Sequence, residues 1–202
     1  MMVCLGLSAA GTTPSILTLL YMPTFANTQL GLPLGDAFIV QSIGLVCLVL
    51  MVLLFGAISD RLGRKPILIG AFGLYLALAY PLFAWVNQGP SIMRLLLMQI
   101  VLCSLHGAFN GPFSTAFVEQ FPTRIRSTGS GIPYNPSVMV FGGSAQFFVT
   151  WLIQATGSPI APVFYLIFGM LVGLVSAFFL VERAHDLRLP SLVTIPPTIG
   201  EA

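Results

Sequence analysis

Residues 56–65 read Gly-Ala-Ile-Ser-Asp-Arg-Leu-Gly-Arg-Lys, a charged stretch set between two long apolar runs. The runs on either side, 37–58 and 66–87, are each long enough to cross a bilayer, because about 20 helical residues span its hydrocarbon core of roughly 30 Å. The charges and glycines of the stretch itself are typical of a tight turn at a membrane surface. The sequence therefore predicts two membrane helices joined by a short polar turn.

The composition of the whole chain supports a membrane protein. Of its 202 residues 56% are hydrophobic and 7% are charged, and the mean hydropathy is +0.96, whereas soluble domains carry about 25% charged residues. A net charge of +2 provides no basic patch for nucleic acid. The cysteines Cys4, Cys47 and Cys103 lie far apart in apolar runs, so neither a metal site nor a cofactor is expected.

Six apolar stretches qualify as membrane-spanning helices by length and composition. They run over residues 1–23, 37–58, 66–87, 92–118, 132–155 and 160–181. The predicted fold class is an all-α membrane protein, with a six-helix transmembrane bundle over residues 1–181 in contact with lipid. Residues 182–202 form a polar tail with several prolines, and we expect it to lack stable structure.

The basic residues predict the orientation of the bundle. With six spans, both termini lie on the same side of the membrane. Of the eight Lys and Arg residues, only Arg94 falls in a loop on the opposite side. Because basic loops stay in the cytoplasm, both termini are predicted to be cytoplasmic.

Two loop motifs carry a resemblance to the major facilitator superfamily. Residues 56–65 fit that family's signature loop, G-x-x-x-D-R-x-G-R-K, and residues 119–126 resemble a second signature, E-x-x-P-x-x-x-R. The fixed positions are Gly56, Asp60, Arg61, Gly63, Arg64 and Lys65 in the first motif, and Glu119, Pro122 and Arg126 in the second, which also contains Arg124. The resemblance implies carriers rather than enzymes.

Further pieces are similar to the metabolite:H+ symporter branch, which includes transporters for citrate, 2-oxoglutarate, shikimate and proline/betaine. They are Tyr21-Met-Pro23, Asn110-Gly111, Tyr134-Asn135 and Gly142-Gly143. The resemblance covers residues 1–183 and implies the carboxy-terminal half of a twelve-helix transporter, built as two inverted three-helix repeats. It also implies proton-coupled symport of an organic acid or zwitterion across a bacterial inner membrane. The partner would be an amino-terminal six-helix half, on a separate chain or missing, or else a second copy of this chain.

The signature loop also has a physical interpretation. Gly56 would let the helix end pack closely on a neighbour, and Gly63 would permit the reversal between spans. Arg64 can pair with Glu119. Asp60 can cap a helix N-terminus, which the resemblance implies would be in the other half. Such contacts would form a cytoplasmic latch between alternating states; alternatively, the basic residues only determine topology.

Polar residues on two spans are candidates for the substrate cavity. Gln99, Cys103, His106 and Asn110 recur at the spacing of one helical face, and the same spacing joins Asn135, Met139, Gly142 and Gln146. Polar groups avoid hydrocarbon, so both faces are expected to meet protein or a cavity. Hydrogen bonds to a substrate and hydrogen bonds between helices are both consistent with the pattern.

His106 and Tyr21 each allow two interpretations. His106 lies near the midplane, where it is either a proton relay or a neutral, hydrogen-bonded side chain. Tyr21 borders the cavity by family likeness, or anchors the span at the interface. The prolines Pro14, Pro133 and Pro136 should bend or interrupt their helices. The pairs Gly107/Gly111 and Gly169/Gly173 are typical of close helix packing.

Two other functions remain as alternatives. Gly129-Ser130-Gly131 resembles the nucleophile turn of an intramembrane serine protease, although His106 is expected to lie far from Ser130. The other alternative is a truncated six-helix membrane protein that does not transport, or a half-transporter that dimerises with itself.

Overall fold

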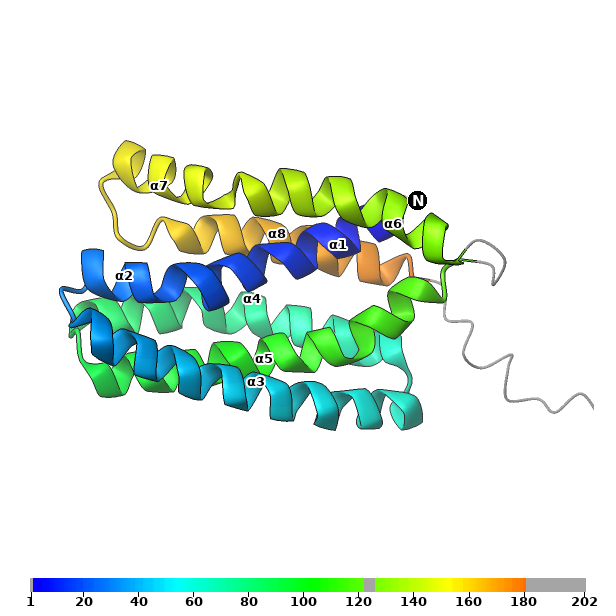
Figure 1. Cartoon of the computed structure of the whole chain (residues 1–202), viewed down its shortest axis with the longest axis horizontal. Coiled ribbons are helices and arrows are strands. Elements are labelled where there is room, and N and C mark those ends of the chain that lie inside the picture. Colours follow the sequence, from blue (N-terminus) through cyan, green and yellow to red (C-terminus); the bar gives the residue numbers. More distant parts are fainter. Residues whose placement is uncertain (1, 122–125, 181–202) are drawn as a thin grey trace, which may run out of the picture.

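The computed structural model describes residues 2–121 and 126–180, apart from the side chains of 126 and 127, as a bundle of helices along one common axis (Figure 1). Three elements form the first span and three form the fifth; the other spans are single helices. In chain order the elements are α1 (Met2–Ser15), the π-helix η1 (Ile16–Tyr21), α2 (Met22–Thr28), α3 (Leu34–Leu62), α4 (Arg64–Gln88), α5 (Ile92–Val118), α6 (Arg126–Ser137), the π-helix η3 (Val138–Gly143), α7 (Ala145–Thr156) and α8 (Pro162–Phe178).

All six predicted spans are helical, which confirms the prediction of an all-α membrane protein. Five helical stretches of the described chain are long and apolar enough to cross a membrane. The sixth, α8, has 17 residues, about 26 Å of helix. Several helices extend past the apolar runs; α3, for example, starts at Leu34 and ends at Leu62. The predicted tail over 182–202 lies outside the described residues.

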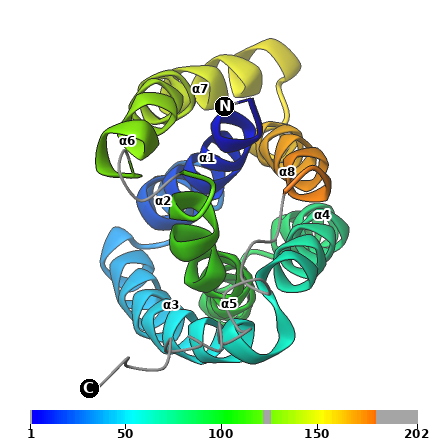
Figure 2. The same cartoon turned by 90° about the vertical axis from the view of Figure 1, so that its right-hand side faces the viewer.

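The even number of spans brings the described ends of the chain to one end of the bundle. The N-terminus, the α3–α4 turn and the end of α8 lie together there (Figure 1). Viewed along the bundle, α5 packs between α3 and α4, while α1 packs between α8 and α6 (Figure 2). Helix α4 joins the two groups by contacting both α5 and α8.

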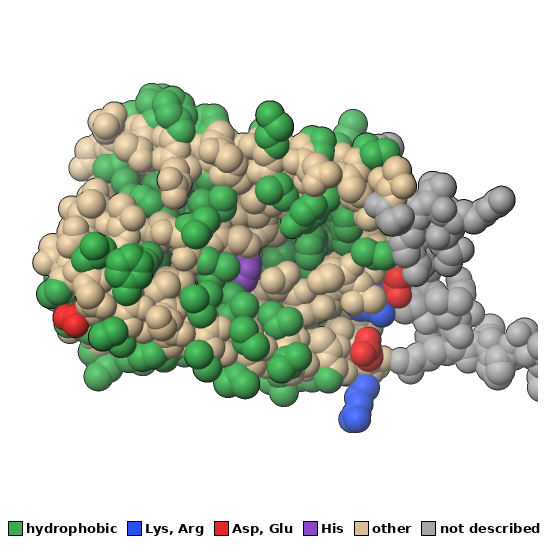
Figure 3. All heavy atoms as spheres, in the orientation of Figure 1, with side chains coloured by type: hydrophobic (Ala, Val, Ile, Leu, Met, Phe, Trp, Pro, Cys, Tyr) green, Lys and Arg blue, Asp and Glu red, His purple; other side chains and the backbone are tan. Residues whose placement is uncertain are grey.

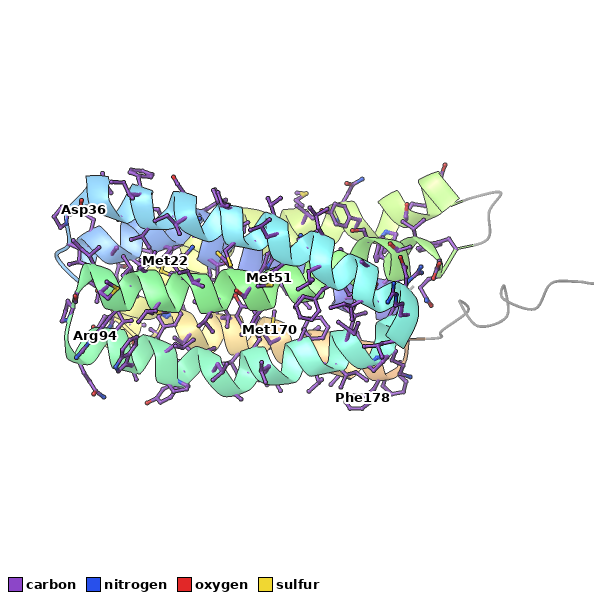
Figure 4. All side chains as sticks on the ribbon, turned by 90° about the horizontal axis from the view of Figure 1, so that it is seen from below. Met22, Asp36, Met51, Arg94, Met170 and Phe178 are labelled. Carbon is purple, nitrogen blue, oxygen red and sulfur yellow. The ribbon has the colours of Figure 1, made fainter. Side chains whose placement is uncertain are left out.

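Glycines allow the two closest helix pairs to form. A Cβ added at Gly107 would lie 2.6 Å from the Cβ of Met51, and one added at Gly111 would lie 2.8 Å from the carbonyl oxygen of Val52. Met51 lies on α3, beside α5, in Figure 4. In the α1–α8 pair, a Cβ at Gly169 would lie 2.6 Å from that of Thr13. The predicted packing role of both glycine pairs is therefore confirmed.

The two glycines of the signature loop differ from each other. Gly63 has a φ of +92°, and its N–H donates to the carbonyl of Ser59 at 3.1 Å, so it makes the predicted reversal between α3 and α4. A Cβ added at Gly56 would meet nothing within 4 Å. The close approach expected of Gly56 instead depends on Gly111, which packs against the Gly56 backbone.

The predicted prolines lie just before the two π-helices. Pro14 precedes η1, and Pro133 and Pro136 precede η3. Proline lacks an N–H and so interrupts the regular helical hydrogen bonds, and a π turn accommodates one extra residue. The carbonyl of Phe141, within η3, accepts a hydrogen bond from the Tyr165 hydroxyl of α8 at 2.7 Å. The three prolines lie inside their helices, and both spans remain helical through them, with only a local change from α to π hydrogen bonding.

Candidate functional site

Charged side chains gather at the end of the bundle that carries the α3–α4 turn (Figure 3). The guanidinium of Arg64, in the first turn of α4, forms an ion pair with the carboxylate of Glu119 at the end of α5. Asp60, one turn before Arg64, lies 3.7 Å from the same guanidinium. The side chains of Arg64 and Glu119 are 12% and 20% exposed, against 69% for Asp60. The pairing suggested for Arg64 and Glu119 is present.

Lys65 has a contact that the sequence did not predict. Its ammonium donates to the carbonyl oxygens of Phe178 at 2.7 Å and Leu180 at 3.2 Å. Phe178 ends α8, where unpaired carbonyls and the helix dipole favour a cation. The α3–α4 turn is therefore tied to the last span. Of the second motif, Pro122 and Arg124 lie outside the described residues, and only the backbone of Arg126 is described.

We expect Lys65→Ala to loosen the end of α8. A cation at a helix C-terminus stabilises it by about 0.3–1 kcal/mol, so amide hydrogen exchange over residues 174–180 should accelerate up to about fivefold. Arg61→Ala is the matched control, because Arg61 is an exposed cation of the same turn. Exchange is measured by mass spectrometry on the full chain in nanodiscs. Equal exchange in the two variants would contradict the role of Lys65.

Gln99 lies in a buried contact between three spans. Its side-chain amide donates to the carbonyl of Thr18 in η1 at 2.8 Å and to Oε1 of Gln41 on α3 at 2.9 Å. Gly44 makes room for it, since a Cβ there would lie 2.7 Å from Cγ of Gln99. The structure thus places Gln99 among hydrogen bonds between helices. Gln41 could not be recognised from sequence, because its hydrogen-bond donor, the side-chain amide of Gln99, is on a distant span.

His106 and Tyr21 both lie in the interior. His106 is 1% exposed; its Nε2 lies 3.3 Å from the Ser15 hydroxyl, and its ring meets the edge of Phe109. Tyr21 is 8% exposed and contacts Phe25, so it lies inside the bundle and not on its outer surface.

A pocket lies one turn beyond His106, between α5 and α6. The volume of this pocket is about 340 Å³. The face of the molecule shown in Figure 3 is hollowed between α6 and α3, the helices on either side of α5 in that view. The lining mixes aromatic rings with amide and hydroxyl groups and contains no charged side chain. It consists of Asn110, Phe113, Ser114, Phe117, Val118, Ser130, Gly131 and Tyr134. The pocket can hold a small molecule through hydrogen bonds and ring contacts.

The polar face expected on the fifth span is interrupted. Asn135 and Gln146 are exposed, as is Met139, but Gly142 is buried against Thr12 of α1. The expectation of one continuous face assumed α-helical spacing, and η3 changes that spacing between Asn135 and Gln146. Among residues 2–121 and 126–180, no cluster of His, Cys, Asp and Glu is suited to a metal ion.

Comparison with known proteins identifies the family. The family model of the Major Facilitator Superfamily matches residues 1–145. The chain belongs to this superfamily. Its members are non-enzymatic carriers, which argues against the alternative of a serine protease built on Ser130.

Curated relatives of this superfamily chain are symporters and transporters of small metabolites. A citrate-proton symporter of Klebsiella pneumoniae is 31% identical over 87% of the chain and 40% of its own length. The ectoine/proline transporter of Corynebacterium glutamicum is 31% identical over 96% of the chain and 38% of its own length. The proline/betaine transporter of Escherichia coli is 26% identical over 92% of the chain and 37% of its own length.

The chain therefore spans about two fifths of the length of these relatives. No solved structure matches it significantly. Family and apolar helices together identify a multi-pass membrane protein of the transporter class, related to proton-coupled metabolite symporters.

Proposed function

We propose that the chain is the carboxy-terminal half of a proton-coupled symporter for a small organic acid or zwitterion. The observation that carries this proposal is the similarity of nearly the whole chain to two-fifths of citrate-proton and proline transporters. Alternating access needs two bundles around one site near the midplane. This bundle supplies one wall, and an amino-terminal six-helix half supplies the other.

The uncovered polar groups of α5 and of the fifth span support this role. Asn135 and Gln146 are exposed, and Asn110 lines the pocket between α5 and α6. Amide groups are costly in contact with lipid. A second bundle packed against the fifth span near Asn135 would cover that amide and would leave the pocket available to a polar substrate.

The charged end of the bundle acts as the cytoplasmic latch. Arg64 and Glu119 both belong to this bundle, so their ion pair fixes the α3–α4 turn against α5. Asp60 is the more exposed group and remains beside Arg64. Its carboxylate is suited to cap a helix N-terminus of the other half, and that contact forms and breaks as the halves rock. In this arrangement both termini face the cytoplasm of a bacterial cell.

We expect Asp60→Asn to leave membrane insertion intact and to lower uptake about tenfold, corresponding to roughly 1.4 kcal/mol. The amide keeps the size of the side chain but removes the charge that a helix N-terminus attracts. Asp36→Asn is the matched control, because Asp36 lies on the same helix at the opposite end of the bundle (Figure 4). Wild-type uptake in the Asp60 variant would leave the loop as a topology signal alone.

An uptake assay tests the proposed function. The chain is expressed with and without an amino-terminal six-helix half of the same superfamily, in cells that lack their own citrate, proline and betaine uptake. Accumulation that requires both halves and is abolished by a protonophore is the expected result. Accumulation by the chain alone would favour a homodimer, and no accumulation in either case would favour a protein that does not transport.

A further inference from the structure

His106 is the only histidine of the described residues, and its ring has one nitrogen without a partner. Nε2 lies 3.3 Å from the Ser15 hydroxyl oxygen, while Nδ1 is buried and has no hydrogen-bond partner. An unpaired polar atom at a buried position costs about 1–3 kcal/mol. Such a cost points to a ligand or a proton that this nitrogen receives.

The hydrogen bonds of Ser15 determine which nitrogen carries the proton. The Ser15 hydroxyl has a single hydrogen, and it donates to the carbonyl of Gly11 at 2.7 Å, the shorter of its two contacts. Its oxygen is therefore left to accept from His106, which requires a proton on Nε2. In this tautomer the lone pair is on Nδ1, where it can accept a proton.

Nothing charged in the described bundle lies at the depth of His106. The described Asp and Glu residues, Asp36, Asp60 and Glu119, are at the helix ends, as are the described Lys and Arg side chains. The other buried titratable side chains are the thiols of Cys4 and Cys103 and the phenols of Tyr21 and Tyr75. An imidazolium at this position would thus be a buried charge without a counter-charge, which is costly.

We propose that Nδ1 of His106 binds the transported proton, and that it does so together with the carboxylate of the substrate. The inference rests on the proposed symport function. The Nδ1 lone pair takes a proton from the aqueous phase and forms an N–H bond; the substrate carboxylate balances the resulting charge. The proton and the substrate then leave together on the opposite side of the membrane, and the N–H bond breaks to restore the neutral imidazole.

His106 does not line the pocket between α5 and α6, but the pocket begins one helical turn from it. Asn110 lines this pocket and lies four residues after His106 on the same face of α5, about one turn or 6 Å along the helix. A carboxylate that close favours the charged form of an imidazole. Because such coupling is reciprocal, the proton also strengthens the binding of the carboxylate, which favours their transport together.

Transport by the chain assembled with its amino-terminal half tests this assignment. With the membrane potential clamped at zero, a gradient of one pH unit should sustain about tenfold accumulation of labelled citrate or proline through one coupled proton. His106→Gln should abolish that accumulation and retain exchange of labelled for unlabelled substrate, because exchange needs no net proton movement. Ser104→Ala is the matched control: Ser104 lies on another face of α5, beside Cys47, and its loss should change neither rate.

Each outcome separates the two proposals. pH-driven accumulation by His106→Gln would overturn the role of His106 and leave symport intact. Exchange without pH-driven accumulation by the wild type would overturn symport, and with it this inference. If His106→Gln loses exchange as well, ¹⁵N spectra of the wild-type assembly in nanodiscs decide, and the signal that is missing from the His106→Gln assembly is that of His106. A free Nδ1 that becomes protonated on adding citrate or proline supports the proposal; a proton on Nδ1 without substrate, or no change with it, overturns it.

Discussion

Replacing Arg64 with glutamate should stop uptake by the assembled transporter while leaving the chain in the membrane. The new carboxylate would face Glu119 at a site where both side chains are at least four-fifths buried, and like charges in such a position repel strongly. We expect uptake to fall more than about tenfold, which corresponds to at least roughly 1.4 kcal/mol. Arg64→Lys should retain part of the activity, because an ammonium keeps the charge but not the planar fork of the guanidinium.

The exchanged pair provides the decisive comparison. Arg64→Glu combined with Glu119→Arg should recover uptake relative to either single variant, since opposite charges again meet between α4 and α5. Arg61→Glu is the matched control, because Arg61 is an exposed residue of the same turn. Uptake of labelled substrate is divided by the amount of protein in the membrane. A double variant as inactive as the single ones would show that the ion pair itself does not determine the rate.

The second large effect is expected at Gly111, where α5 crosses α3. A methyl group at this position would lie 2.8 Å from both the Val52 carbonyl oxygen and the Gly56 nitrogen. These are backbone atoms, which cannot rotate away, so Gly111→Ala must push the two helices apart. Overpacking of this kind costs about 1–3 kcal/mol. Thermal unfolding of the full chain in detergent micelles, followed by circular dichroism, should show a clearly lowered midpoint.

Gly56→Ala is the matched control, on the other helix of the same crossing. A Cβ at Gly56 would meet nothing within 4 Å, and alanine favours a helix over glycine. The midpoint of this variant should equal that of the wild type or exceed it. A loss at Gly56 as large as that at Gly111 would contradict the packing of α3 against α5.

Much of the fold could be predicted because the bilayer imposes simple requirements on sequence. Apolar runs of span length, charges confined to the turns and glycines spaced four apart each have one dominant physical cause. The signature loop indicated the family for a similar reason, since Gly63 makes a local turn and Arg64 pairs with Glu119, which stands at the start of the second motif. The structure and the comparisons agree with these predictions.

The remaining features depend on contacts between distant segments. The bond from Lys65 to the end of α8 and the contact of Gln99 with Gln41 arise only when separate spans pack. The face joining Asn135 to Gln146 was wrong as a continuous face, because a π turn changes the helical spacing. Proline marks where regular bonding ends, but whether a kink or a π turn results is decided by neighbours such as Tyr165.

The π turn of the fifth span lies beside the start of the π turn of the first, as Gly142 of η3 packs on Thr12 of α1 and on Ile16, the first residue of η1. Each stores one residue beyond the α-helical count. If the π turn moved along its helix, each side chain that it passed would rotate about the helix axis by about 100°, and the helix would stay intact. The first and fifth spans thus each contain a π turn at a similar depth. Movement of that turn allows one end of the helix to rotate about the helix axis while the opposite end of the same helix stays fixed.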